Sequence, residues 1–195
     1  MKKQGIFQAF TTLDIVLMAM LATANGAMTF YLSVVNKALN SLGGPIATST
    51  ITGLYMVYGL LAYYIIRKPG TAVITYALGA VVQSFIGTAY GITSVIAAAA
   101  CYMVVAELVF ALLRYRVWNR FIMMIAGAAL VPIWFLIAAR LFGYMEWGWN
   151  VLLIALAVRI VSGAVLCGLV SKLLGDALVK TGLLRRFAAS TQGRA

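Results

Sequence analysis

Long apolar runs alternate with short polar or basic segments from one end of this 195-residue chain to the other. A helix needs ~20 apolar residues to cross the ~30 Å hydrocarbon core of a bilayer, and most of the runs approach or reach that length. Because they recur along the whole chain, the pattern predicts an all-α polytopic membrane protein with one transmembrane domain over residues 1–195. The six predicted membrane-spanning helices are residues 11–33, 48–66, 71–87, 91–113, 121–142 and 151–174.

The segments between the predicted helices contain residues that start or end helices. Residues 34–45 are too polar to cross a bilayer and end in Gly-Gly-Pro, which predicts an external loop. Residues 67–70, with the sequence RKPG, predict a sharp basic turn. Before the first helix, Thr11 and Asp14 resemble a capping box with Asp in place of Glu. In the fifth helix, Pro132 predicts a kink.

The basic residues gather at one end of the predicted helices. The chain has 15 Lys and Arg against 4 Asp and Glu, yet no soluble basic region that could hold a duplex, so we expect no nucleic-acid partner. Lys37 and Arg140 fall on the opposite side. By the positive-inside rule, both termini are predicted to be cytoplasmic. The residues on the basic side are Lys2, Lys3, Arg67, Lys68, Arg114, Arg116, Arg120 and the group that begins at Lys172.

The composition excludes several classes of function. Hydrophobic residues make up 64% of the chain and charged residues 10%, against roughly 25% charged residues in soluble domains. The sequence has no His, which excludes His-based triads and zinc-protease motifs, and its acids are not paired at helical spacing. We therefore expect no enzymatic activity, no cofactor and no metal site. Cys101 and Cys167 lie in apolar runs without metal-ligand spacing and are interpreted as small buried hydrophobic side chains.

Two charged side chains lie well away from the ends of the predicted membrane-spanning helices. An ionisable group costs roughly 2.5–3.5 kcal/mol to insert into lipid, so Glu107 and Arg159 should face protein or water. At ~1.5 Å per residue, Glu107 falls in the cytoplasmic half of its helix and Arg159 near the midplane. The sequence leaves two interpretations open for Glu107: a buried ion pair with Arg159 or a neighbouring basic group that joins two helices, or a role in ligand binding or coupling.

Polar and aromatic side chains in the outer half of the predicted helices are candidates for a ligand pocket. An amide in an apolar helix needs a hydrogen-bond partner, which a ligand or a neighbouring helix can provide. Aromatic rings can stack on a planar ligand and attract a positive one. Trp147 and Trp149 are more typical of an interfacial belt or a lid. The candidate substrate-binding residues are Asn25, Tyr31, Tyr55, Gln83, Tyr90, Trp134 and Glu146.

Two segments resemble a known family. The first is IIRKPGTAVITYALGAVVQSFIGTAYGIT and the second is AELVFALLRYR. They resemble the YkoE-type permease subunits, the membrane-embedded substrate-binding (S) components of energy-coupling factor (ECF) transporters for thiamine or its hydroxymethylpyrimidine (HMP) precursor. The resemblance implies six helices, an outward-opening vitamin site capped by the loop after the first helix, and no ATP hydrolysis by this chain.

The resemblance also implies partners and a location. The partners would be a transmembrane T subunit and two cytoplasmic ATPase subunits, in a bacterial plasma membrane. S components of this kind dock on the T subunit through small residues of the first helix, and the positions that fit are Ala19, Ala22, Thr23 and Gly26. Such residues let helices approach closely in lipid. The alternatives are an S component for another vitamin, a solitary carrier without ATPases, and a non-transport membrane scaffold.

Thiamine accounts for some of these residues better than for others. Its aminopyrimidine is flat, with hydrogen-bond donors and acceptors, and its thiazolium is a fixed cation. Tyr and Trp faces with Gln, Asn and Glu146 would suit both halves. An unpaired Arg beside a cation would repel it. A thiamine site therefore requires Arg159 to be paired or turned away from the ligand.

Overall fold

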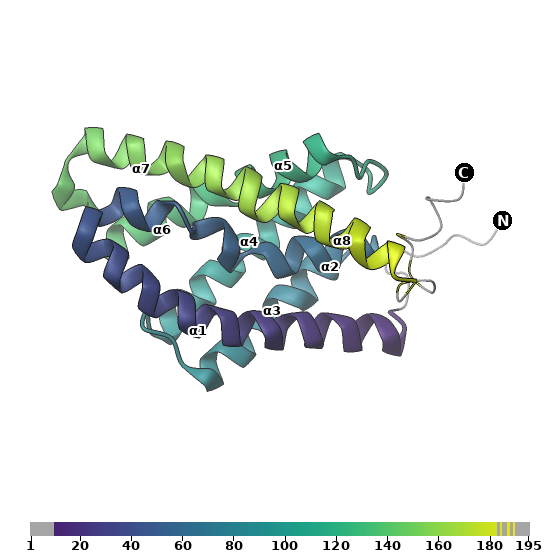
Figure 1. Cartoon of the computed structure of the whole chain (residues 1–195). Helices are drawn as coiled ribbons and strands as arrows, with labels where there is room; N and C mark the ends of the chain where they lie inside the picture. The colour runs from purple at the N-terminus through teal and green to yellow at the C-terminus, as the bar shows by residue number, and fades with distance from the viewer. Residues whose placement is uncertain (1–9, 183, 185–186, 188, 190–195) are drawn as a thin grey trace.

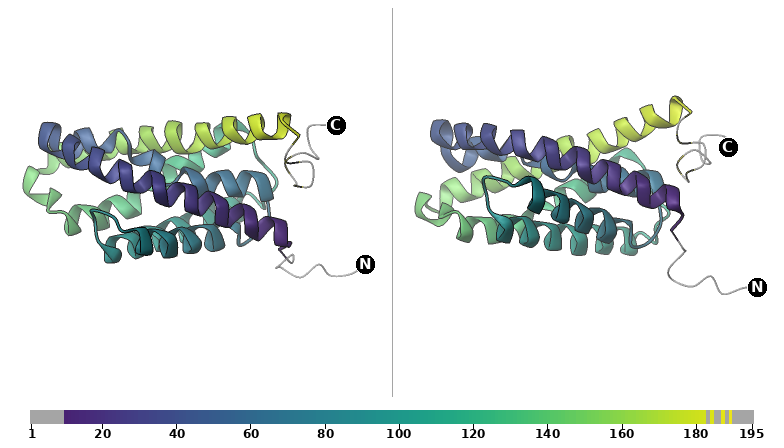
Figure 2. Two further views of the ribbon diagram at one scale, coloured as in Figure 1. Left: turned by 60° about the horizontal axis from the view of Figure 1, so that its bottom comes forward. Right: turned by 90° about the horizontal axis from the view of Figure 1, so that it is seen from below.

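The computed structural model describes residues 10–182, 184, 187 and 189, and every regular element in this part of the chain is helical. The start of α1 and the end of α8 lie at the same end of an elongated bundle (Figure 1, Figure 2). The α-helices are α1 (Thr12–Ser49), α2 (Val57–Ile66), α3 (Thr71–Ile86), α4 (Ile92–Leu112), α5 (Arg120–Ala129), α6 (Val131–Leu141), α7 (Trp149–Ser162) and α8 (Val170–Lys180). The shorter elements are the 3-10 helices η1 (Thr52–Tyr55) and η2 (Tyr144–Trp147) and the π-helix η3 (Gly163–Leu169).

Several helices have the length and apolarity that membrane crossing requires. In the described part of the chain, four stretches meet both conditions, whereas α2 and α3 are apolar but shorter, with 10 and 16 residues. The all-helical membrane fold predicted from the hydropathy pattern is thus confirmed. The four stretches are Thr12–Ser49, Ile92–Leu112, Arg120–Leu141 and Trp149–Lys180.

The first helix starts as the sequence predicts. The Thr11 hydroxyl accepts a hydrogen bond from the Asp14 amide at 3.3 Å, and the Asp14 carboxylate accepts one from the Thr11 amide at 2.8 Å. Lys68, in the basic turn between α2 and α3, lies 2.6 Å from the same carboxylate. Asp14 therefore caps α1 and also ties its start to that turn.

The predicted external loop over residues 34–45 is wrong for most of its length. The only residues of α1 with non-helical backbone angles are Gly43 and Gly44, and Gly44 has φ +56°. Residues 34–42 contain no helix breaker, so the helix continues past the end of the apolar run. Its polar positions divide between two faces: Asn36 is buried, whereas Lys37 is exposed. The polarity of residues 36–41 therefore belongs to a helix with one inward-facing amide and an exposed polar side, not to a loop.

The predicted helix over residues 48–66 is interrupted by η1. A Cβ atom on Gly53 would lie 2.3 Å from the backbone oxygen of Ser162, so only glycine allows this approach. The Gly53 amide donates to the Ser162 hydroxyl at 3.0 Å, and that hydroxyl donates to the carbonyl of Thr50 at 2.8 Å. The non-helical backbone of this segment is thus satisfied by α7, as membrane-embedded irregular segments require.

The structure divides the fifth predicted helix into two and extends the sixth beyond its predicted end. The fifth divides into α5 and α6 at Leu130, just before Pro132 in the first turn of α6, which agrees with the predicted kink. The sixth runs on through η3 into α8. A Cβ on Gly127 of α5 would lie 2.2 Å from the Gly163 backbone oxygen. Glycines therefore bring α5 and η3 into backbone contact.

Candidate ligand-binding site

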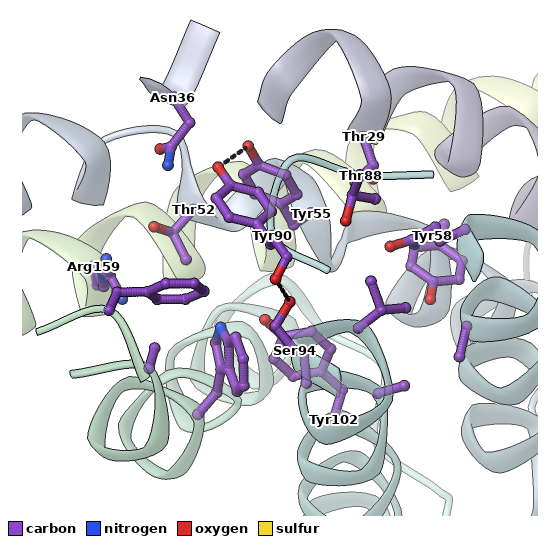
Figure 3. A pocket seen from close by; sticks show the side chains of 18 of the residues that line it. Thr29, Asn36, Thr52, Tyr55, Tyr58, Thr88, Tyr90, Ser94, Tyr102 and Arg159 are labelled. Carbon is purple, nitrogen blue, oxygen red and sulfur yellow. Dashed lines mark hydrogen bonds between the residues drawn. The ribbon is translucent and has the colours of Figure 1, made fainter. Parts of the chain in front are cut away.

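A cavity of about 90 Å³ lies between the helices (Figure 3). It is toward the end of the bundle opposite the basic turn at residues 67–70. α3 leads from that turn to the turn at residues 87–91, which contributes Thr88 and Tyr90 to the wall. The volume is enough for several water-sized groups, because one water molecule needs roughly 10–15 Å³ of such space. The other elements that line the cavity are α1, η1, α2, α3, α4, α6, η2 and α7.

Aromatic rings form much of the cavity wall. The Tyr55 and Tyr90 hydroxyl oxygens lie 3.2 Å apart and join η1 to the turn before α4. The Tyr90 ring meets the Phe142 ring edge-on, with centroids 5.6 Å apart. Planar rings in several orientations can hold a flat aromatic ligand by stacking and edge contacts. The aromatic residues that line the cavity are Tyr55, Tyr58, Tyr90, Tyr102, Trp134, Phe142 and Tyr144.

Hydroxyl and amide groups add hydrogen-bonding capacity to these walls. Asn36 and Gln83 line the cavity from α1 and α3. The buried Thr88 hydroxyl oxygen has no hydrogen-bond partner among the described residues, so it can bond to a ligand. Burial raises the pKa of the Tyr90 hydroxyl above its ordinary value, so this group is a neutral hydrogen-bond donor or acceptor at neutral pH. These groups suit a ligand with both donors and acceptors.

Arg159 brings a positive charge to one side of the cavity. The side chain is 5% exposed, and its Nε donates to the Ser49 hydroxyl at 2.9 Å. Its guanidinium carbon lies 4.8 Å from the centroid of Phe135 and 5.4 Å from that of Tyr144. Figure 3 shows Arg159 and Tyr58 on opposite sides of the space. The cavity therefore has a cationic side and an uncharged side.

A second depression adjoins the cavity. It has a volume of about 260 Å³ and shares part of the cavity wall, including Asn36 and Tyr90. Its other lining residues are Lys37 and Asn40, both exposed on α1, and Ala89. The side chains common to both spaces therefore separate the cavity from a polar surface at this end of the bundle.

The structure brings several of the predicted substrate-binding residues together. Tyr55, Gln83, Tyr90 and Trp134 line the same cavity, although they come from η1, α3, the turn before α4, and α6. Whether they contact a ligand stays a prediction.

The other predicted substrate-binding residues lie outside the cavity wall. Asn25 is buried, and its amide nitrogen donates to the Thr29 hydroxyl, which does line the cavity. Tyr31 is 71% exposed because it lies on the opposite face of α1 from Thr29. Glu146 is exposed on η2, two positions after the buried Tyr144. Tyr31 and Glu146 are therefore not part of the cavity wall in this structure, and Asn25 supports it from behind.

Sequence reasoning missed several lining residues, and for some of them a signal was present. Asn36 was overlooked because its segment was predicted to be a loop, although it continues the buried face of α1 that includes Thr29. Tyr58 stands three positions after Tyr55, the helical spacing that places both near one face. Tyr102 lies in a long apolar run, where no local pattern distinguishes a lining residue from a packed one.

The predicted Glu107–Arg159 ion pair is wrong. One Glu107 carboxylate oxygen accepts hydrogen bonds from the hydroxyls of Tyr63 at 2.8 Å and Tyr115 at 3.2 Å. The other oxygen is buried without a hydrogen-bond partner among the described residues. Arg159 instead bonds to Ser49. The two charged groups lie at different depths, one toward the basic end and one beside the cavity, so neither reaches the other.

The predicted docking residues divide into two pairs. Ala22 is fully buried in the main hydrophobic cluster of the chain. A Cβ on Gly26 would lie 2.8 Å from Val82 of α3, so Gly26 serves the contact between α1 and α3. These two residues are not on the surface, and their assignment to partner docking is wrong for this structure. Ala19 is half-buried and Thr23 is exposed, so both stay candidates for docking.

Comparison with known proteins agrees with this architecture. Residues 13–133 match the family model described as the permease component of an ABC-type cobalt transport system. The chain is 30% identical over 175 residues to YkoE of Bacillus subtilis (strain 168), described as a candidate HMP/thiamine permease protein, and the match covers 90% of this chain and 87% of that protein. A crystal structure of an S component of an ECF transporter matches with a TM-score of 0.89 and 28% sequence identity, over 95% of this chain and 94% of the other.

The fold and the cavity define a membrane-embedded transporter component rather than an enzyme. The chain belongs to the YkoE-type S components of ECF transporters. The resemblance stated from the sequence is thereby confirmed.

Proposed function

We propose that this chain is the substrate-binding component of a vitamin importer in a bacterial plasma membrane, and that it captures HMP or thiamine from outside the cell. The observation that carries this proposal is the aromatic cavity with hydrogen-bonding groups, including the unpartnered Thr88 hydroxyl. A flat aminopyrimidine ring with donors and acceptors fits such walls. The description of YkoE as a candidate HMP/thiamine permease supports the same class of ligand.

The charge distribution supports an outward-facing cavity. We propose six membrane-spanning helices with both termini in the cytoplasm, where the basic turns at residues 67–70 and 113–119 would also lie. The turn at residues 87–91 and η2, which line the cavity, would then be at the outer surface. A ligand would enter from outside without crossing the apolar core.

Handover to the cell interior would require partner subunits. We propose a T subunit in the membrane and two ATPases in the cytoplasm, with Ala19 and Thr23 on the docking surface. Reconstituted uptake tests this part: ligand should enter vesicles only when the T and ATPase subunits and ATP are present. Uptake by the chain alone would indicate a solitary carrier instead.

The experiment that tests the ligand site compares two neighbouring residues of α3. Gln83 lines the cavity, whereas Phe85 is 85% exposed. Gln83→Ala should weaken binding of HMP or thiamine by about two- to tenfold, because a hydrogen bond worth about 0.5–1.5 kcal/mol is lost. Phe85→Ala should leave the affinity unchanged. Equal affinities of wild type and Gln83→Ala would remove Gln83 from the site, and an effect confined to Phe85→Ala would contradict the proposed cavity.

A further inference from the structure

The turn at residues 113–119, which joins α4 to α5, presents two arginines at the surface of the bundle. It lies at the end where α1 begins and α8 ends, opposite the cavity (Figure 1). Arg114 and Arg116 are exposed, and their side chains form no hydrogen bond or ion pair among the described residues. Each guanidinium has five N–H donors. Both arginines therefore have donors and charge available for an anion.

The backbone of this turn is held in an uncommon conformation. Arg114 and Tyr115 have φ +51° and +56°, a left-handed region that residues other than glycine rarely adopt. Such a conformation persists only where the surrounding structure fixes it. The Tyr115 hydroxyl donates to Glu107 at 3.2 Å, and the indole nitrogen of the buried Trp118 donates to the Tyr115 carbonyl at 3.2 Å. Tyr115 is thereby held against the helices, while the arginines on either side of it stay at the surface.

No carboxylate among the described residues pairs with Arg114 or Arg116. Asp176 attracts Arg120, at the start of α5, but its ion pair is with Lys172. A further positive charge lies close by, because the Arg67 guanidinium carbon is 5.3 Å from the centroid of Trp118. The turn is therefore a site of uncompensated positive charge. The other three acidic residues are Asp14, paired with Lys68, Glu107, bonded to two tyrosines, and Glu146 on η2.

Helix length places these arginines at the boundary of a bilayer. α4 has 21 residues, or ~31 Å at ~1.5 Å per residue, close to the ~30 Å thickness of the hydrocarbon core. The apolar stretch Arg120–Leu141 has 22 residues and starts at the same end. Leu112, the last residue of α4, is 83% exposed, and Phe121, the second residue of α5, is 76% exposed. These two apolar side chains face the acyl chains, so the arginines between them lie at the level of the lipid phosphates.

We infer that this turn binds the headgroup of an anionic phospholipid in the leaflet on the basic side of the chain. Arg114 and Arg116 contact the phosphate, and Leu112 and Phe121 contact the acyl chains. Arginine suits a phosphate because its planar fork of donors forms paired hydrogen bonds. A cytoplasmic protein would meet the arginines but not the two apolar side chains within the membrane, whereas a lipid meets both. This lipid site lies at the opposite end from the cavity and is independent of the proposed vitamin.

The test is a titration of the full-length chain, in micelles of a neutral detergent, with phosphatidylglycerol and separately with phosphatidylcholine. Native mass spectrometry counts the bound lipid. Each basic residue beside an anionic lipid contributes about fivefold to affinity. Wild type should therefore prefer phosphatidylglycerol by at least about tenfold. Arg114→Gln combined with Arg116→Gln should weaken its binding about 25-fold and phosphatidylcholine binding much less, so the preference is largely lost.

Two control variants remove one basic residue elsewhere. Arg140→Gln, at an exposed arginine in the last turn of α6, lies at the other end of the bundle and should leave both affinities unchanged. Lys180→Gln, at an exposed lysine in the last turn of α8, lies at the same end as the turn. It should weaken phosphatidylglycerol binding less than Arg116→Gln, which alone should cost about fivefold. If the double variant does not fold, Arg116→Gln carries the test, because Arg116 lies outside the left-handed part of the turn.

Three results would overturn the inference. The first is equal affinity of wild type for the two lipids. The second is an equal loss in Lys180→Gln and Arg116→Gln, which would indicate a diffuse attraction rather than a site at this turn. The third is an unchanged lipid preference in the arginine variants together with lost assembly with cytoplasmic ATPase subunits, which would assign these arginines to a protein partner.

Discussion

Replacing Glu107 with Gln separates a structural role of this carboxylate from a role in ligand binding. One carboxylate oxygen accepts from Tyr63 and Tyr115, at 2.8 and 3.2 Å, and the other is buried without a partner among the described residues. An amide placed there either turns its NH₂ group toward the two hydroxyls or leaves it in the unpartnered position. Both arrangements lose favourable hydrogen bonding.

The expected loss of stability follows from that geometry. An unsatisfied buried donor costs about 1–3 kcal/mol. For a domain of this size, each kcal/mol corresponds to roughly 2–4 °C in unfolding temperature, so Glu107→Gln should unfold about 2–12 °C lower than wild type. Ligand affinity should change less than about twofold, because Glu107 is not among the residues that line the cavity.

The assay is thermal unfolding of the detergent-purified chain, together with a vitamin titration of the same sample. Glu146→Gln, at an exposed acid outside the cavity wall, is the matched control and should alter neither quantity. A Glu107→Gln variant with an unchanged unfolding temperature but a large loss of affinity would refute the structural interpretation. It would also favour the ligand-binding or coupling role that the sequence left open.

Two further substitutions test the packing of the bundle, and a third tests the docking surface. Gly127→Ala should lower the free energy of unfolding by about 1–3 kcal/mol, because the added Cβ would lie 2.2 Å from the Gly163 backbone oxygen. Thermal or denaturant unfolding measures this change, and an unchanged stability would contradict the contact. Ala22→Leu should also destabilise the chain, since Ala22 is fully buried. Thr23→Leu should leave stability and vitamin affinity intact but reduce co-purification with the T subunit, and undiminished assembly would place the docking surface elsewhere.

The start of the first helix and the all-helical class of the fold could be predicted from the sequence because their causes are local. The capping interactions of Thr11 and Asp14 need only three residues of spacing, and the structure contains both of them. Pro132 similarly marks the break between α5 and α6. Residues 34–42 were predicted wrongly because a hydropathy pattern cannot distinguish a polar loop from a helix that faces a polar cavity. Nothing in the sequence near Gly53 indicates its contact with Ser162 of α7, which lies 109 positions later in the chain.

Depth along the helices and residue type predicted some of the residues that line the candidate site. Tyr55 and Gln83 line the cavity because they lie toward its end of the bundle and face inward. Tyr31 has the same depth but the wrong helical phase, and phase depends on which neighbour α1 packs against. Arg159 was paired with Glu107 from rough depths along their helices, whereas in the structure the two groups lie at different depths and bond to other residues. Such pairings depend on tertiary packing, which single-helix periodicity does not specify.

The central claim is that the aromatic cavity binds an aminopyrimidine vitamin, and calorimetric titration of purified wild-type chain with HMP tests it most directly. The account predicts saturable binding of one HMP per chain, with the fluorescence of the cavity-lining Trp134 changing in the same concentration range. Absence of heat and of a fluorescence change, in a sample that unfolds cooperatively on heating and also fails to bind thiamine, would contradict it.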